Sequence, residues 1–147
     1  MADAISNPGG GGKLAVRLVT PNRVLVDATA DAVELPSSSG YLEALYGHAP
    51  LLAELGAGEV RLHGGSSGDQ RFFVAWGFAE VLPERVTILA EEALRPDEID
   101  VTGAEQEMQA GQRLWSEAGD DGRKYDEANA ITRKAEEKVA SAEGRST

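Results

Sequence analysis

Residues 40–62 read "GYLEALYGHAPLLAELGAGEVRL", and this stretch decides how the rest of the chain is interpreted. It resembles a strand that ends, an apolar loop, and a second strand that starts at "GEVRL". Leucines and tyrosines lie on both sides of His48 and Pro50. A loop with this many apolar residues either fills the core of its own domain or forms an exposed surface that binds a partner. Both interpretations remain open on this stretch alone.

The segments on either side alternate between apolar and polar residues with a period of two, which is typical of strands with one buried face. The alternating segments read "LAVRLVT" (14–20), "RVLVD" (23–27), "DAVELP" (31–36), "GEVRLHG" (58–64), "RFFVAWGFAEVLP" (71–83) and "RVTILAEE" (85–92). Short strands separated by turns with Gly and Pro indicate a flattened β-sandwich or barrel. Gly77 interrupts one strand, and it predicts a bulge or a sharp bend there. "GAG" at 56–58 predicts a turn between strands.

The pattern changes at Pro96. Apolar residues then recur at three- and four-residue steps from Val101 to Ala118 and from Ala128 to Ala142, which predicts two helices. We therefore expect an α+β fold in which the sandwich precedes an antiparallel two-helix hairpin. The expected divisions are a flexible leader (1–13), a β-sandwich domain (14–95) and a C-terminal helical hairpin (96–147). The helical stripes are mostly Ala and Gly, so the hairpin should dock weakly and move easily.

Composition narrows the class of protein. The chain has 14 basic and 25 acidic residues and a formal net charge of −11, which argues against nucleic acid as a partner. It has no Cys, and none of its apolar runs approaches the roughly 20 residues of a membrane span. The N-terminus lacks the pattern of a signal or transit peptide. These features indicate a cytosolic protein.

Motifs of catalysis and ligand binding are weak. "GGSSG" at 64–68 has the G-x-S-x-G spacing around Ser66, but the following helix and downstream histidine of that motif are missing, so a hairpin loop is favoured. "GGGGK" at 9–13 lacks the spacing and the hydroxyl residue of a phosphate loop. Two histidines without Cys are too few for a metal site. His48 either bonds to backbone beside Pro50 or contacts a partner, and His63 should face solvent.

Two stretches taken together point to a family. The opening stretch fits G-x-L-x-x-x-x-G-H-x-P-L-L, and the later strands fit G-x-x-E-V and V-x-[IV]-L-A-[DE]-x-A. The matching residues are Gly40, Leu42, Gly47, His48, Pro50, Leu51, Leu52, Gly77, Glu80, Val81, Val86, Leu89, Ala90 and Ala93. This combination resembles the epsilon subunit of bacterial F-type ATP synthases, strongly up to Leu94 and weakly beyond.

The resemblance implies a non-catalytic subunit at the foot of the rotary central stalk, peripheral to the cytoplasmic face of the bacterial inner membrane. One surface of the sandwich would grip the gamma subunit, and the end with the apolar stretch would lie on the membrane proton ring. The residues that match ring-facing positions are Thr20, Tyr41, Leu42, Glu43 and His48. The hairpin would inhibit ATP hydrolysis by presenting a basic helix to the beta subunits. Its basic residues are Arg123, Lys124, Arg133, Lys134 and Lys138.

Three departures qualify the resemblance. Glu43 replaces a Gly and Tyr46 replaces a Pro of the family pattern, so Glu43 requires a compensating partner or a shifted loop. "IDVTGA" at 99–104 has Gly103 where nucleotide-binding members carry Arg. Without that guanidinium, which binds phosphate in a bidentate way, we expect no ATP on the hairpin and no other cofactor. The alternative function is a free-standing sandwich adaptor with a helical partner-binding tail.

Overall fold

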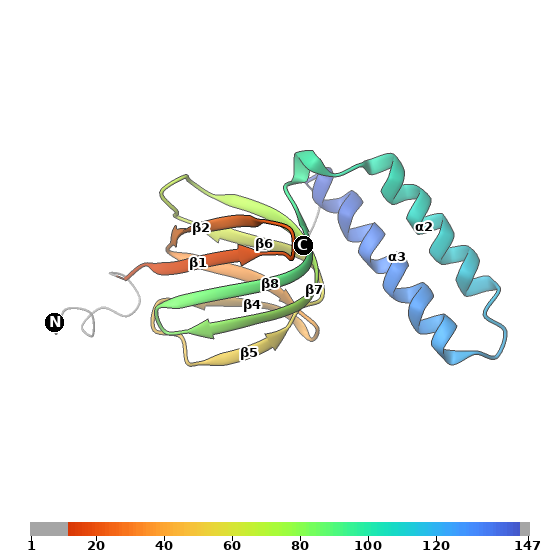
Figure 1. Cartoon of the computed structure of the whole chain (residues 1–147), viewed down its shortest axis with the longest axis horizontal. Coiled ribbons are helices and arrows are strands. Elements are labelled where there is room, and N and C mark those ends of the chain that lie inside the picture. Colours follow the sequence, from red (N-terminus) through yellow and green to blue (C-terminus); the bar gives the residue numbers. More distant parts are fainter. Residues whose placement is uncertain (1–11, 145–147) are drawn as a thin grey trace.

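The computed structural model describes residues 12–144, and it consists of a β-sandwich joined to a two-helix hairpin (Figure 1). The strands are β1 (Leu14–Val19), β2 (Val24–Ala30), β3 (Ala32–Ser37), β4 (Gly40–Leu45), β5 (Leu51–Glu54), β6 (Ala57–His63), β7 (Gln70–Leu82) and β8 (Arg85–Leu94). The helices are a short 3-10 turn η1 (Pro96–Glu98), α2 (Val101–Ser116) and α3 (Gly122–Ala142). The predicted α+β class, strands first and helices after, is confirmed. Of the predicted leader, residues 1–11 lie outside the described part.

One continuous sheet folds over itself to make the sandwich. Its strands follow the order β2-β1-β8-β7-β6-β3-β4, and β5 pairs with β7 beside this path. The first half of β7 pairs with β6 and the second half with β5. Between the halves Trp76 and Gly77 take φ angles of 62° and 116°. A Cβ on Gly77 would lie 2.1 Å from the Leu89 carbonyl oxygen, so the predicted sharp bend is confirmed and requires glycine.

The core lies between the two halves of the folded sheet, and strand alternation builds it. On β1, Leu14, Val16 and Leu18 are at most 1% exposed, while the residues between them face outward. Val, Leu and Ala side chains of the other strands complete the cluster, together with Phe72. The period-two pattern therefore identified the buried face of β1 correctly.

Residues 40–62 begin and end with strands as expected, β4 and β6, but the apolar loop expected between them is wrong in part, because it contains a further strand, β5. Ala44 and Ala53 are buried, and Leu42 packs against the core, whereas Leu45 and Leu52 face outward. With apolar side chains on both faces, the alternation that marks a strand disappears from the sequence. The expected turn at "GAG" is also shifted: Gly56 joins β5 to β6, but the rest belongs to β6.

The hairpin depends on small residues where its two helices meet. Ala104 and Gly111 of α2 and Ala128 and Ala135 of α3 are buried. A Cβ on Gly111 would lie 3.1 Å from the backbone nitrogen of Thr132 and 3.2 Å from the Ala128 oxygen, so the helices approach closely at this point.

The predicted stripe fails at Trp115, which is 52% exposed. Its ring instead meets Tyr125 edge to face, with centroids 5.1 Å apart. In the described part of the chain, no helix combines the length and hydropathy needed to cross a membrane.

The hairpin meets the sandwich only near its root. Figure 1 shows α2 and α3 running side by side away from the strands, with η1 and the last turns of α3 closest to them. Helix α3 contacts β6 and β7 there. Phe73, Ala57 and Ala75 form a second buried cluster, separate from the main core and packed against Leu94 and Ile99.

Candidate partner-binding surfaces

Four apolar side chains lie in a row across the outer face of four neighbouring strands. Val24 on β2 pairs with Val19 on β1, Val19 pairs with Leu89 on β8, and Leu89 pairs with Phe78 on β7. Val24, Leu89 and Phe78 are 51%, 54% and 52% exposed. We call these four residues the apolar row. Because they face away from the core, the sandwich does not need them for its own packing.

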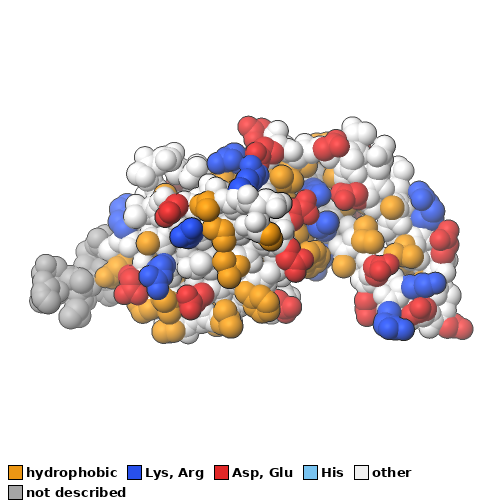
Figure 2. All heavy atoms as spheres, viewed as in Figure 1, with side chains coloured by type: hydrophobic (Ala, Val, Ile, Leu, Met, Phe, Trp, Pro, Cys, Tyr) orange, Lys and Arg blue, Asp and Glu red, His pale blue; other side chains and the backbone are white. Residues whose placement is uncertain are grey.

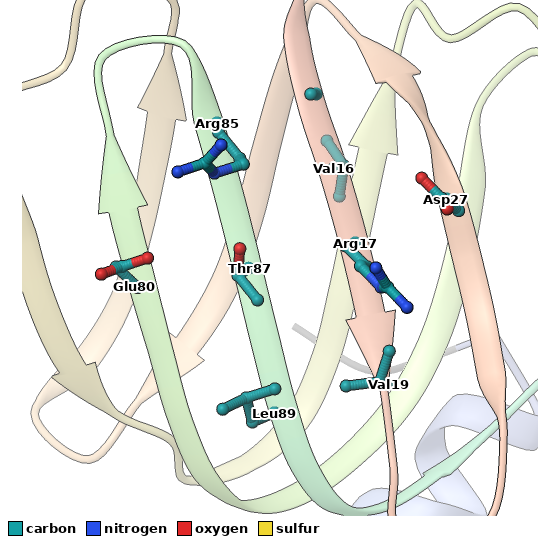
Figure 3. A pocket seen from close by; sticks show the side chains of 9 residues that line it. Val16, Arg17, Val19, Asp27, Glu80, Arg85, Thr87 and Leu89 are labelled. Atoms are coloured by element: carbon teal, nitrogen blue, oxygen red, sulfur yellow. The ribbon is translucent and has the colours of Figure 1, made fainter.

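A row of polar side chains runs beside the apolar row on the same face. Arg17 pairs with both Asp27 and Thr87, and Thr87 pairs with Glu80. These residues, together with Val19, Leu89 and Arg85, line a groove of about 570 Å³. Figure 3 shows Arg17 and Val19 on one strand beside Thr87 and Leu89 on the next. The face therefore combines an apolar strip with both signs of charge.

The apolar surface continues toward the sheet edge at β5. Leu52 is opposite Glu80 and is 70% exposed, the largest exposed fraction among the large apolar residues of the described part. In Figure 2, hydrophobic side chains follow the front of the sandwich and its lower edge, between scattered charges. Sequence reasoning did not single out Val24, Phe78 and Leu52 as exposed apolar residues.

The five predicted ring-facing residues do not form one surface. Tyr41 and Glu43 point outward from β4, whereas Leu42 packs against the core. The Tyr41 hydroxyl accepts a hydrogen bond of 2.8 Å from the Glu59 backbone, and its ring lies 5.3 Å from the Arg61 guanidinium. Glu43 is exposed and stands opposite Glu34 of β3, so the pairing brings two acids together.

The other two predicted residues lie in turns. His48 is half-buried in the connection between β4 and β5, where its Nδ1 lies 2.6 Å from the Ala49 carbonyl oxygen. This contact agrees with the interpretation of His48 as a residue bonded to backbone. Thr20 directly follows β1, and its hydroxyl accepts hydrogen bonds of 3.2 Å from the backbone of Asn22 and Arg23. Thr20 therefore adjoins the apolar row rather than β4.

The basic side chains of α3 divide into two groups. Arg123, Lys124 and Arg133 are exposed. Lys134 and Lys138 instead bind Glu92 of β8 at 3.2 and 2.9 Å. A strand of the sandwich, rather than α2, therefore supplies the carboxylate that binds both lysines.

The ion pairs at Glu92 shift the pKa values of the groups that form them. Burial alone would raise the pKa of Glu92, but the hydrogen bonds and charges of Lys138 and Lys134 outweigh it and lower the pKa. Burial likewise opposes the charge on Lys138, yet Glu92 and Glu107 raise its pKa. Lys138 reaches Glu107 of α2 at 3.3 Å, so one ammonium joins α2, α3 and β8.

A second ion pair fixes the root of the hairpin. Arg23, in the β1–β2 turn, donates two hydrogen bonds to Glu98 of η1, at 3.0 and 2.7 Å. Glu98 also accepts the Arg95 backbone N–H at 2.8 Å. These hydrogen bonds, from Arg23 first and the Arg95 backbone second, lower the pKa of Glu98 to about 2.

The cleft between the hairpin and the sandwich is acidic. It has a volume of about 390 Å³, and Glu98, Asp100, Glu107 and Lys138 line it together with Gly103. Gly103 donates its backbone N–H to the helix-capping carboxylate of Asp100 at 3.0 Å. Three carboxylates and one ammonium are a poor donor set for phosphate.

The catalytic motifs considered in the sequence are not assembled into sites. Ser66 is exposed in the turn that joins β6 to β7, so the hairpin-loop interpretation is confirmed. His63 is half-buried at the end of β6, rather than fully solvent-facing. It lies 3.2 Å from Glu34 and 3.8 Å from Asp69. Within residues 12–144 no three acidic or histidine side chains are grouped to hold a metal ion.

Comparison with known proteins agrees with this architecture. Residues 13–96 match the family model described as ATP synthase, Delta/Epsilon chain, beta-sandwich domain. The ATP synthase epsilon chain of Koribacter versatilis is 48% identical over 99 residues, which cover 66% of this chain and 68% of that one. The epsilon chain of Microcystis aeruginosa is 38% identical over 133 residues, which cover 89% of this chain and 96% of that one. The chain belongs to the epsilon chain family of ATP synthases, and so to the components of an enzyme complex.

Solved structures add evidence about the fold alone. A chain of the Euglena gracilis mitochondrial ATP synthase aligns with a TM-score of 0.72 at 17% identity, over 86% of this chain and 79% of that one. A chain of the Tetrahymena thermophila mitochondrial enzyme aligns with a TM-score of 0.58 at 16% identity, over 88% and 99%. The sandwich with its helical extension therefore recurs in distant ATP synthases.

Proposed function

We propose that this chain is the non-catalytic central-stalk subunit of a rotary, proton-translocating ATP synthase. In this role it is peripheral to the cytoplasmic face of the bacterial inner membrane and links the gamma subunit to the membrane proton ring. Family membership supports the assignment to the complex. The observation that carries the proposal further is the apolar row, an exposed surface with no role in the core.

The apolar row is the surface that we assign to the gamma subunit. Val24, Leu89 and Phe78 leave about half of their surface in water. Covering apolar surface contributes about 25 cal/mol per Å², before the costs of association are subtracted. The neighbouring charged row carries both signs, so it would fix the orientation of the partner more than its affinity.

The membrane ring is assigned to the predicted set Thr20, Tyr41, Leu42, Glu43 and His48. In this proposal Tyr41 and Glu43 touch the ring directly, because both point outward from β4. Leu42 acts from beneath, by packing β4 against the core. This assignment rests on the family resemblance and on the exposure of β4.

The hairpin is proposed to inhibit ATP hydrolysis. When it is docked, Arg123, Lys124 and Arg133 are exposed, while Glu92 binds Lys134 and Lys138. A raised hairpin would present all five basic residues to an acidic surface of the beta subunits. Glu92 and the beta subunits would then compete for the same two lysines, and this competition would set the balance between the two positions. We propose that the hairpin does not bind ATP, because Gly103 has no cationic side chain to bind phosphate and the cleft around it is acidic.

Binding to an isolated gamma subunit tests the first assignment. Leu89→Asp places a charge in the centre of the apolar row and should weaken binding at least tenfold. Leu45→Asp is the matched control, because Leu45 is 45% exposed on β4, away from the row. If the two variants bind gamma with equal affinity, the apolar row is not part of the interface. Failure of the unmodified chain to bind gamma would favour a free-standing adaptor.

ATP hydrolysis by reconstituted complexes tests the regulatory role. Deletion of residues 96–147 should raise hydrolysis. Glu92→Gln should lower it, because the variant releases Lys134 and Lys138 for the beta subunits. Glu91→Gln serves as the control, since Glu91 is the exposed neighbour on β8. Identical rates in all four complexes would show that the hairpin does not regulate hydrolysis.

A further inference from the structure

A buried carboxylate lies beneath the docked hairpin. Glu59 of β6 is 1% exposed, and it is the only fully buried acidic residue in the described part of the chain. Its Oε1 accepts a hydrogen bond of 3.0 Å from Nε of Arg61, and its Oε2 accepts one from Nη1 of Arg71. These three residues belong to β6 and β7, so the sandwich neutralises the carboxylate by itself.

The hairpin adds a third donor to this carboxylate. Ser141, in the last turn of α3, is fully buried, and its hydroxyl donates a hydrogen bond of 2.6 Å to Oε2 of Glu59. Arg71 returns a bond of 3.3 Å to the Ser141 backbone oxygen. One residue of the hairpin therefore provides both a donor and an acceptor to a charged pair in the sandwich.

We propose that Glu59, Arg71 and Ser141 form a latch that adds to the free energy of undocking the hairpin. The latch can open without damage to the sandwich, because Glu59 keeps both arginines when Ser141 leaves. A hydrogen bond to a charged group, made out of contact with water, is among the strongest single bonds available to this interface. The regulatory meaning of the latch rests on the proposed function, whereas its existence is a property of the chain alone.

The latch differs physically from the other contact of α3. The carboxylate of Glu92 is 33% exposed, and salt screens such pairs. Glu59 and Ser141 are shielded from solvent, so salt should hardly change their bond. Loss of the latch should therefore have the same effect at low and high ionic strength, whereas neutralising Lys138 should lose its effect as salt is added.

Thiol reactivity of the full chain measures undocking over a wide range. The chain has no Cys, so Ala57→Cys introduces a single thiol, 4% exposed in the wild type, in the cluster on β6. Its modification rate is proportional to the fraction of open molecules when closing is fast. In this background, Ser141→Ala should raise the rate about tenfold or more, since charge-assisted hydrogen bonds contribute at least that factor. Ser66→Ala, at an exposed serine, is the matched control.

A double-mutant cycle identifies the partner of Ser141. In a Glu59→Gln background, Ser141→Ala should raise the modification rate much less than in the parent chain. Urea unfolding of every variant confirms that the sandwich is folded. A rate that is unchanged by Ser141→Ala, or an equal increase in both backgrounds, would overturn the latch. If the cycle demonstrates the latch but Ser141→Ala does not change the rate of ATP hydrolysis by the complex, the proposed regulatory function is wrong. The latch itself would remain supported.

Discussion

Gly111→Ala should destabilise the hairpin, although the same change in most helices stabilises them. Gly111 lies inside α2, where alanine normally contributes up to about 1 kcal/mol relative to glycine. Here the added methyl group would stand 2.3 Å from the Thr132 hydroxyl, 3.1 Å from its backbone nitrogen and 3.2 Å from the Ala128 oxygen. The hydroxyl can rotate away, but the two backbone atoms move only if the helices separate.

The magnitude follows from two opposing effects. Overpacking a close contact costs about 1–3 kcal/mol. The gain in helix propensity offsets up to about 1 kcal/mol of this cost. When the full gain is subtracted, we expect a net loss of up to about 2 kcal/mol, with no change in the strands.

Helical circular dichroism during thermal unfolding measures this loss. The matched control is Gly122→Ala, at the first residue of α3, where a Cβ would meet no atom within 4 Å and φ needs no glycine. Gly122→Ala should be neutral or stabilising. If Gly111→Ala raises the midpoint as much as the control does, the close approach of α2 and α3 is not what selects glycine there.

Three further outcomes are expected. Because the pKa of Glu98 is lowered from its ordinary value of 4.5 to about 2, its ion pair stabilises the fold fully at pH values above 4.5. This contribution should disappear as the pH falls through about 2. The difference in melting temperature between the wild type and Arg23→Gln should shrink over the same pH interval. A chain of residues 13–95 should still unfold cooperatively, at a somewhat lower temperature because Phe73 loses the cover of the hairpin, and a molten product would contradict this. Tyr41→Ala combined with His48→Ala should weaken coupling of proton flow to ATP synthesis. The sandwich should remain folded, with a melting temperature lowered because the Glu59 backbone N–H loses its acceptor. Normal coupling in this variant would make both residues purely structural.

The strands that have one buried face were predictable, and those with two apolar faces were not. β1 alternates strictly, so its sequence gives both its conformation and its orientation. β5 carries leucines outside as well as an alanine inside, and its sequence looks like a loop. Both helices followed from their periodicity, because the small residues at their contact recur at helical steps.

The surfaces were harder to predict than the fold, for two physical reasons. The sequence alone does not show whether an apolar residue is exposed or buried, so Phe78 and Leu89 were indistinguishable from core residues. The latch joins Glu59 to a serine 82 positions later, and only the docking of the hairpin brings them together. Similarly, Glu92 competes with the acidic helix α2 for the lysines of α3. Counting charges along the sequence does not predict which carboxylate binds them.

The parallel pairing of β1 with β8 has a consequence for the order in which the chain is folded during synthesis. Ala15 pairs with Arg85, so β1 cannot take its place in the sheet until β8 has been synthesised. Contacts this distant in sequence form slowly. The hairpin, made directly afterwards, would find its docking site only once β8 is in place. A chain synthesised only up to residue 84 should therefore hold an incomplete sandwich, because every β8 partner of β1 is still missing.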